Sequence, residues 1–313
     1  MKNYFKNKKI LIAGGSGLVG TNLLIKLIGL KAKVEASYNT KIQAKEHCKL
    51  YKKYNFLNKN DCNRATKNKD VVYICAVKGS GIKKIRENFF TNIQDNLLLR
   101  LNILEACKKN KVKKIIWVSS STVYQEYNKK MKEKDLNLNK DPYDIYYGIG
   151  WTYRYLEKIF NYFQNFFNMD IKIVRTSSIY GPYDNFNLQT SHVIPGLIKK
   201  SLDKKKKIEV WGDKKVIRDF VYISDLIEFL LTITMINKKL KPINFSNGKP
   251  ITIEKLAKKI SSLTKKKIEF KKKQYSSASY RVLNNQLANR IKKIKRTNLT
   301  DGLIKTIHWY KNK

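Results

Sequence analysis

KILIAGGSGLVG, at residues 9–20, combines a short apolar run with three glycines spaced three residues apart. The apolar run is typical of a buried parallel strand, and from Leu18 to Leu30 apolar residues recur at the spacing of a helix. The segment therefore predicts a strand, a tight turn and a helix in succession. In such a unit Gly14 permits the turn, Gly17 lets the backbone approach a ligand, and Gly20 lets helix and strand pack closely.

The turn predicts a site for the pyrophosphate of a dinucleotide. Free N–H groups at the start of a helix, together with the helix dipole, bind phosphate oxygens. The residues that would supply this cradle are the three glycines and their neighbours, namely Gly14, Ser16, Gly17, Leu18, Val19 and Gly20. An ordinary glycine turn is the alternative, and the strand and helix on either side of the loop argue against it.

The tip of the second expected strand favours NADP over NAD. An acidic residue there would bind the ribose hydroxyl of NAD. The segment at 36–41 is ASYNTK and holds no carboxylate, because Glu35 falls inside the strand. Thr40 and Lys41 are placed to meet a 2′-phosphate, although Lys41 also fits as one more surface lysine and NAD remains possible.

Strand and helix signals alternate along the first half of the chain, which predicts a doubly wound parallel sheet of the Rossmann type. Further strands are expected at 33–38, 70–75, 114–119 and 171–175, and helices at 88–110 and 147–168. After Gly181-Pro182 the segments become shorter and richer in turns. Helices are expected there at 191–202, 224–236 and 252–264, with Thr252 as N-cap, and strands at 207–210 and 243–245. We expect a dinucleotide-binding domain at 1–178 and a smaller α/β substrate domain at 179–313.

Composition indicates a globular protein, with 313 residues of which 42% are hydrophobic. No apolar run is long enough to span a bilayer, and the four cysteines show no metal-type spacing, so we expect a cytoplasmic protein without metal or membrane partner. The net charge of +42 raises nucleic-acid binding as an alternative. Because the lysines are scattered over the whole chain, compositional bias is the better explanation, and the charge would attract an anionic substrate.

Several motifs carry a resemblance to a known family. They are SSSTVY at 119–124, IYGPYDNF at 179–186 with SHVIP at 191–195, VWG at 210–212 with RDFV at 218–221, and AVKGSG at 76–81. Through them the chain resembles the extended short-chain dehydrogenase/reductases, in particular the nucleotide-sugar epimerases and reductases, and among these the GDP-L-fucose synthases. The resemblance runs nearly from end to end, and it implies that Ala76 contacts the cofactor.

The resemblance implies a catalytic serine at Ser120, which would hold the reacting oxygen, and a tyrosine that acts as general acid/base. Tyr147 is the candidate tyrosine. The family has a lysine four residues after this tyrosine, and here that position is Trp151. Arg154 or Lys158 is the candidate replacement for the positive charge, with arginine the poorer match to a flexible ammonium.

The resemblance also implies an epimerisation base at His192, although a lone histidine is more often structural. Fucose synthases pair it with a cysteine, and Thr122 stands at that position here. Matching positions assign Trp211, Arg218 and Arg281 to the nucleotide sugar, where arginine suits diphosphate oxygens. Two interpretations of Asn92 and Asn96 stay open. They either lie beside the cofactor or pack in the core.

The leading hypothesis is an NADP-linked reductase/epimerase of a nucleoside-diphosphate deoxysugar, with a GDP-linked substrate favoured. A redox-neutral 4-epimerase is the enzymatic alternative. The other alternative is a cofactor-binding member without catalysis, either regulatory or nucleic-acid-associated. A 4,6-dehydratase is disfavoured, because Val123-Tyr124 stands where that class has an acidic pair. The family resemblance further implies a homodimer built on the helices at 88–110 and 147–168.

Overall fold

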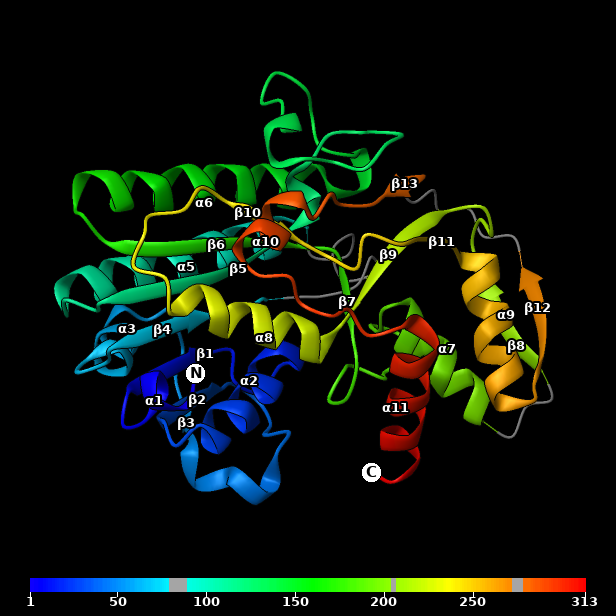
Figure 1. Cartoon of the computed structure of the whole chain (residues 1–313), viewed down its shortest axis with the longest axis horizontal. Helices are drawn as coiled ribbons and strands as arrows, with labels where there is room; N and C mark the ends of the chain where they lie inside the picture. The colour runs from blue at the N-terminus through cyan, green and yellow to red at the C-terminus, as the bar shows by residue number, and fades with distance from the viewer. Residues whose placement is uncertain (79–88, 204–206, 272–277) are drawn as a thin grey trace.

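The computed structural model describes residues 1–78, 89–203, 207–271 and 278–313 (Figure 1). Its largest element is a seven-stranded parallel sheet in the order β10-β6-β5-β4-β1-β2-β3. The strands are β1 (Lys9–Ala13), β2 (Lys33–Tyr38), β3 (Tyr51–Lys53), β4 (Val71–Ile74), β5 (Lys114–Ser120), β6 (Asp170–Thr176) and β10 (Ile243–Phe245). The predicted Rossmann-like sheet is confirmed, and β3 is a strand that the sequence analysis missed because it is short and largely polar.

Helices cover both faces of this sheet (Figure 1). On one face lie α3 (Lys59–Thr66), α5 (Phe89–Lys109) and α6 (Tyr147–Phe166), and on the other lie α2 (Leu18–Gly29) and α8 (Ile223–Thr234). Successive residues of β1 enter opposite cores: Ile10 and Ile12 pack with α2 and α8, while Leu11 and Ala13 pack with α5 and α6. A strand buried on both faces is apolar throughout, which explains the unbroken run at 9–13.

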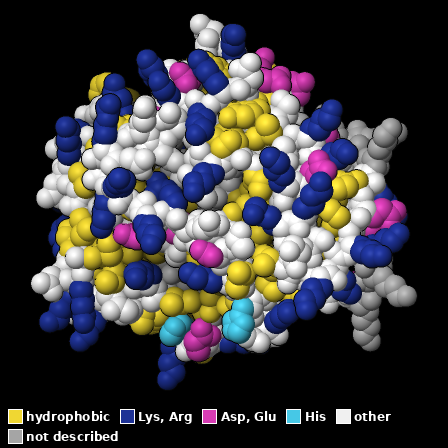
Figure 2. Space-filling model, turned by 45° about the vertical axis from the view of Figure 1, so that its right-hand side comes forward, with side chains coloured by type: hydrophobic (Ala, Val, Ile, Leu, Met, Phe, Trp, Pro, Cys, Tyr) yellow, Lys and Arg dark blue, Asp and Glu magenta, His cyan; other side chains and the backbone are white. Residues whose placement is uncertain are grey.

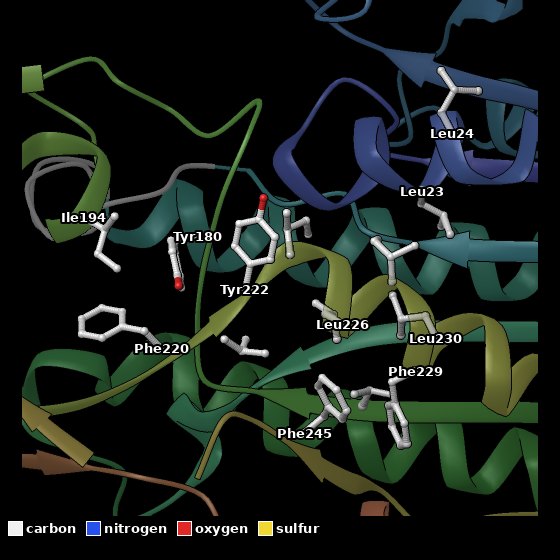
Figure 3. Close-up of a cluster of buried hydrophobic side chains, with 14 of the residues drawn as sticks. Leu23, Leu24, Tyr180, Ile194, Phe220, Tyr222, Leu226, Phe229, Leu230 and Phe245 are labelled. Carbon is white, nitrogen blue, oxygen red and sulfur yellow. The ribbon is translucent and has the colours of Figure 1, made fainter. Parts of the chain in front are cut away.

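The later part of the chain returns to the large sheet. Helix α8 packs on α2, with Leu226 and Leu230 facing Leu23 (Figure 3). The rings of Phe229 and Phe245 stack at 4.4 Å, which joins α8 to strand β10 at the sheet edge. The two parts of the chain therefore share a hydrophobic core. The domain boundary between residues 178 and 179 stays a prediction.

The second part of the chain builds two small sheets beside the carboxyl ends of the large one. Strand β9 (Ile217–Tyr222) pairs with β7 (Ser178–Tyr180), β11 (Pro250–Thr252) and β13 (Tyr280–Arg281), and β8 (Lys207–Trp211) pairs with β12 (Lys267–Lys271). Helices α7 (Val193–Leu202), α9 (Ile253–Thr264) and α11 (Leu299–Lys311) pack against these sheets, whereas α10 (Gln286–Ile291) packs on β10 of the large sheet. Thr252 caps α9 as predicted, because its side chain accepts a hydrogen bond from the Lys255 amide.

The remaining elements are short. They are α1 (Lys2–Phe5) and four 3₁₀ turns, η1 (Lys45–Leu50), η2 (Ser121–Val123), η3 (Glu133–Asp135) and η4 (Asp144–Tyr146). Lysines and arginines spread over the whole visible face instead of gathering in one patch (Figure 2). Within the described parts of the chain, no helix has the length and apolarity needed to cross a membrane.

Candidate active site

A cavity of about 1430 Å³ opens at the carboxyl ends of the parallel strands. It lies where the strand order reverses, between β1 and β4, which is the position at which open α/β sheets bind ligands. The glycine loop and the segments that follow β2, β4 and β5 line part of it, and residues of the second part of the chain also contribute to the lining. Of the predicted site residues, the cavity wall includes Ser16, Leu18, Val19, Thr40, Lys41, Ala76, Ser120, Thr122, His192, Trp211, Arg218 and Arg281.

Each of the three glycines in the loop has a different steric environment. Gly14 has φ +88°, and a Cβ there would lie 2.5 Å from the Ala76 nitrogen. A Cβ on Gly20 would lie 2.1 Å from the Gly14 oxygen, so only glycine lets α2 start this close to β1. Gly17 lines the cavity, and its nearest neighbour would be the Gly14 oxygen at 3.5 Å. A side chain at Gly17 would therefore extend into the space that a pyrophosphate needs, and the loop fits a dinucleotide.

The expected adenosine end of the cavity lacks a carboxylate from β2. Glu35 is held away by the Tyr54 hydroxyl at 3.0 Å and the Lys69 ammonium at 3.3 Å. Thr40 and Lys41 line the cavity in its place. The pKa of Lys313 is lowered by burial and by the positive charge of Lys41, so two ammonium groups lie close together here. An additional phosphate would find positive charge at this end.

Hydroxyl groups gather where β5 and β6 end. Ser120 Oγ accepts a hydrogen bond from the Thr122 amide at 3.2 Å, which fixes the turn after β5. Thr122 Oγ1 and Ser177 Oγ are buried and make no hydrogen bond within the described residues, and both residues line the cavity. A buried hydroxyl without a partner is costly, so these groups fit a wall that contacts a polar ligand.

The face of α6 that meets the cavity differs from the sequence expectation. Tyr146, Ile149 and Tyr153, spaced three and four residues apart, line the cavity, whereas Tyr147 is 48% exposed and does not. Further along the same helix Glu157 is buried, pairs with Arg175 at 2.6 Å and accepts from Ser119 at 2.8 Å. Because Tyr146 and not Tyr147 lines the cavity, Tyr146 replaces Tyr147 as the candidate acid.

Tyr146 lies between two arginines of the second part of the chain. The Arg281 guanidinium is 4.9 Å from the Tyr146 ring centroid. Burial alone would raise the pKa of Tyr146, but the positive charges of Arg281 and Arg218, together with their hydrogen bonds to the hydroxyl, lower it below its ordinary value. Such an environment suits a phenol that must release a proton near neutral pH.

Neither predicted replacement for the missing lysine reaches the cavity. Arg154 turns the other way: its Nε donates to the Val123 carbonyl and its Nη1 to the Lys140 carbonyl, each at 2.6 Å. It ties α6 to the loop that follows β5. Lys158 is exposed and lies outside the cavity wall. Trp151, at the family's lysine position when counted from Tyr147, donates its indole N–H to Asp141 at 2.8 Å.

The predicted sugar-binding residues come together on the wall that the second part of the chain supplies. Burial and the like charge of Arg281 lower the pKa of Arg218 to about 10. Neither arginine forms an ion pair with a carboxylate in the described residues, so an anionic ligand would supply the missing charge. The pKa of His192 is lowered by desolvation within the cavity and by Arg281, which favours a neutral imidazole able to accept a proton.

Asp184 is a cavity residue that the sequence analysis did not single out, although it stands inside the quoted motif. Its Oδ1 accepts from the Asn185 amide at 2.7 Å, while its Oδ2 is buried and makes no hydrogen bond within the described residues. Burial raises the pKa of Asp184 to about 7. The raised pKa results from burial in the folded protein, so the sequence alone could not predict it.

We expect Asp184→Asn to change how stability depends on pH. A carboxyl whose folded pKa lies above its unfolded value stabilises the fold below the unfolded pKa, and that contribution is lost as pH rises from about 4 through about 7. The variant should therefore gain about 3 kcal/mol relative to the parent between pH 5 and pH 8, since about two pK units of the shift are expressed in that window. Denaturant midpoints at both pH values test this, and a constant difference would contradict it.

Comparisons with known proteins place this geometry in a family. The model of the NAD dependent epimerase/dehydratase family matches residues 10–245. GDP-L-colitose synthase of Yersinia pseudotuberculosis is 25% identical over 97% of this chain and 98% of its own length. GDP-L-fucose synthase of Escherichia coli K12 is 25% identical over 77% of this chain and 80% of its own length. The structure of UDP-glucose 4-epimerase from Thermotoga maritima, solved with UDP-glucose, superposes with a TM-score of 0.87 at 19% identity, covering 97% and 99% of the two chains.

Fold and site together define a dinucleotide-dependent enzyme of the Rossmann type. The chain belongs to the NAD dependent epimerase/dehydratase family, and it is an NAD(P)-dependent nucleotide-sugar epimerase/reductase. The short-chain dehydrogenase/reductase resemblance proposed from the sequence is thereby confirmed.

Proposed function

We propose that the protein is an NADP-linked reductase/epimerase of a nucleoside-diphosphate deoxysugar, with the GDP-linked sugar favoured. The observation that carries this proposal is the single cavity that joins the glycine loop to the arginine pair Arg218 and Arg281. Ser120 and His192 line the same cavity. Relatives named for GDP-linked sugars support the choice of nucleotide.

The residues divide the chemistry among them. When bound, NADPH supplies the hydride to a sugar carbonyl carbon. Ser120 holds the carbonyl oxygen, and Tyr146 donates the proton that completes the new hydroxyl. Because Arg218 and Arg281 stabilise the phenolate left behind, proton release costs less than from an isolated tyrosine. The same arginines hold the diphosphate through charge-assisted hydrogen bonds.

His192 supports an epimerisation step before reduction. A neutral imidazole in the cavity can remove a proton from carbon next to the ketone, and Thr122, in place of a thiol, makes His192 the stronger base of the two. Turnover with NADPH in D₂O should place deuterium at the epimerised carbon, and His192→Asn should abolish this label while NADPH oxidation continues. Deuterium retained in His192→Asn would remove the histidine from this role.

A redox-neutral 4-epimerase is the second candidate function, since the structural relatives include UDP-sugar 4-epimerases. In that reaction the hydride returns to the opposite face of the sugar, so cofactor is not consumed. Stoichiometric oxidation of NADPH favours the reductase, and product formation without net oxidation favours the 4-epimerase.

Lys41 should set the cofactor preference. We expect Lys41→Glu to lower the ratio of NADP to NAD affinity by about tenfold at low salt, because a carboxylate would face the 2′-phosphate. Lys45→Glu is the matched control, since Lys45 is exposed nearby and does not line the cavity. Titration of both dinucleotides gives the ratio, and equal effects of the two variants would contradict the assignment.

We further propose a homodimer through α5 and α6, which pack side by side. Their exposed large hydrophobic side chains are Phe90, Leu98, Tyr147, Tyr155, Tyr162 and Phe166. Burial of such a patch between two copies would stabilise the assembly. A monomeric mass at micromolar concentration would contradict it. The cytoplasmic location stays a prediction, and the four cysteines are free thiols in the structure.

A further inference from the structure

The cavity-facing side of α6 ends at a tyrosine that a buried cation contacts. Tyr153 is 5% exposed and lines the cavity. Its hydroxyl accepts a hydrogen bond from Arg100 Nη2 at 2.8 Å, and the guanidinium lies 4.8 Å from the ring centroid. Because Arg100 can only donate, the phenolic proton of Tyr153 is left to be donated elsewhere.

Arg100, on α5, is fully buried without a carboxylate partner in the part of the chain that the structure describes. Its Nη1 donates to the carbonyl and side-chain oxygens of Asn96 at 2.8 and 2.9 Å, and its Nη2 also donates to the Ala76 carbonyl at 3.0 Å. Its Nε makes no hydrogen bond there. Burying a charged guanidinium that has only dipolar partners costs free energy. We therefore expect Arg100 to act on a ligand bound in the neighbouring cavity.

The part of the cavity next to Arg100 is where the nicotinamide half of a bound dinucleotide would lie. Ala76, Asn96 and Tyr153 all line the wall in front of Arg100. Ala76 follows β4 and packs against Gly14, and β4 lies between β1 and β5. A dinucleotide with its pyrophosphate at the start of α2 and its adenosine over β2 would carry its second ribose across β4, toward Ser120.

We propose that Tyr153 and Arg100 together form the site for the hydroxyls of the nicotinamide ribose. Tyr153 contacts the ribose, and the buried Arg100 supplies positive charge next to the Tyr153 hydroxyl. The proposal rests on the proposed cofactor. Tyr153 donates to one ribose hydroxyl, and the buried guanidinium orients it. The charge of Arg100 disfavours the cationic ring of NADP⁺ relative to the neutral ring of NADPH, so the site prefers the reduced cofactor. A tyrosine–arginine pair thus replaces the lysine that Arg154 and Lys158 fail to supply.

Binding to the whole chain, without sugar, tests the pair. Dissociation constants are measured for NADPH and for 2′,5′-ADP, which contains the adenosine half only. Tyr153→Phe should weaken NADPH about tenfold, the value of one lost hydrogen bond, and leave 2′,5′-ADP unchanged. Tyr155→Phe, on the same helix but 52% exposed and outside the cavity wall, should change neither. Equal weakening of both ligands, or unchanged NADPH affinity, would overturn the proposal.

Arg100→Gln tests the charge separately. The parent should bind NADPH more tightly than NADP⁺, and the variant should bring the two affinities closer together. A ratio that does not move in a folded variant would refute the role of Arg100, and if the variant does not fold, the Tyr153→Phe result decides. NADPH binding that depends on Tyr153 in a protein that reduces no ketosugar would keep this inference and reject the proposed function.

Discussion

Tyr146→Phe is expected to lower kcat for ketosugar reduction by about 10²–10⁴-fold, the usual contribution of a positioned general acid. Tyr147→Phe is expected to change kcat less than twofold, because Tyr147 points away from the cavity. The two substitutions each remove a single oxygen from adjacent residues at the start of α6. The two variants therefore form a matched pair. The chemical change is the same in both, and the residues differ in whether the side chain faces the cavity.

The physical reason is the environment of the Tyr146 hydroxyl. Arg218 and Arg281 hold the pKa of Tyr146 below the ordinary value, whereas Tyr147 is 48% exposed and does not line the cavity. NADPH affinity should be unchanged in both variants, which separates catalysis from cofactor binding. A large loss in Tyr147→Phe with full activity in Tyr146→Phe would mean that α6 rotates when substrate binds.

Gly17→Val is expected to abolish measurable NADPH binding while the protein stays folded. The valine side chain would occupy the cavity space in front of the loop, and its Cβ would meet only the Gly14 oxygen at 3.5 Å. Loss of a favourable N-cap should cost about 1 kcal/mol of stability or less. Fluorescence titration with NADPH and a thermal melt of the same sample measure the two effects.

Gly20→Ala is the matched control, and there we expect the main effect on stability. Its Cβ would lie 2.1 Å from the Gly14 oxygen, so α2 would have to move away from β1. Such overpacking costs about 1–3 kcal/mol, and the melting temperature should fall. A Gly17→Val protein that binds NADPH as well as the parent would show that the pyrophosphate does not lie at this loop.

The sequence predicts the large sheet well because a strand buried on both faces leaves an unbroken apolar run. The apolar runs at 10–13, 71–74 and 115–118 fall in strands for this reason. Short edge elements such as β3 and β13 carry no such signal, since tertiary pairing and not local pattern decides them. The glycine loop is equally readable, because each glycine answers one steric demand.

The sequence could not predict which tyrosine at the start of α6 faces the cavity. Tyr146 and Tyr147 are neighbours with equal propensities, and a shift of one residue turns a helix by about 100°. Only the three-dimensional structure distinguishes them, since Tyr146 lines the cavity and Tyr147 is 48% exposed. Arg100 was missed for the same reason, because only its enclosure between α5, α6 and β4 separates it from a surface arginine.

The central claim is tested most directly by following NADPH absorbance with a panel of nucleoside-diphosphate 4-keto-6-deoxysugars. We predict stoichiometric NADPH oxidation with the GDP-linked ketosugar, weaker turnover with its UDP- and dTDP-linked counterparts, and loss of oxidation in Tyr146→Phe. Binding of NADPH without oxidation by any member of the panel would contradict a reductase of these sugars.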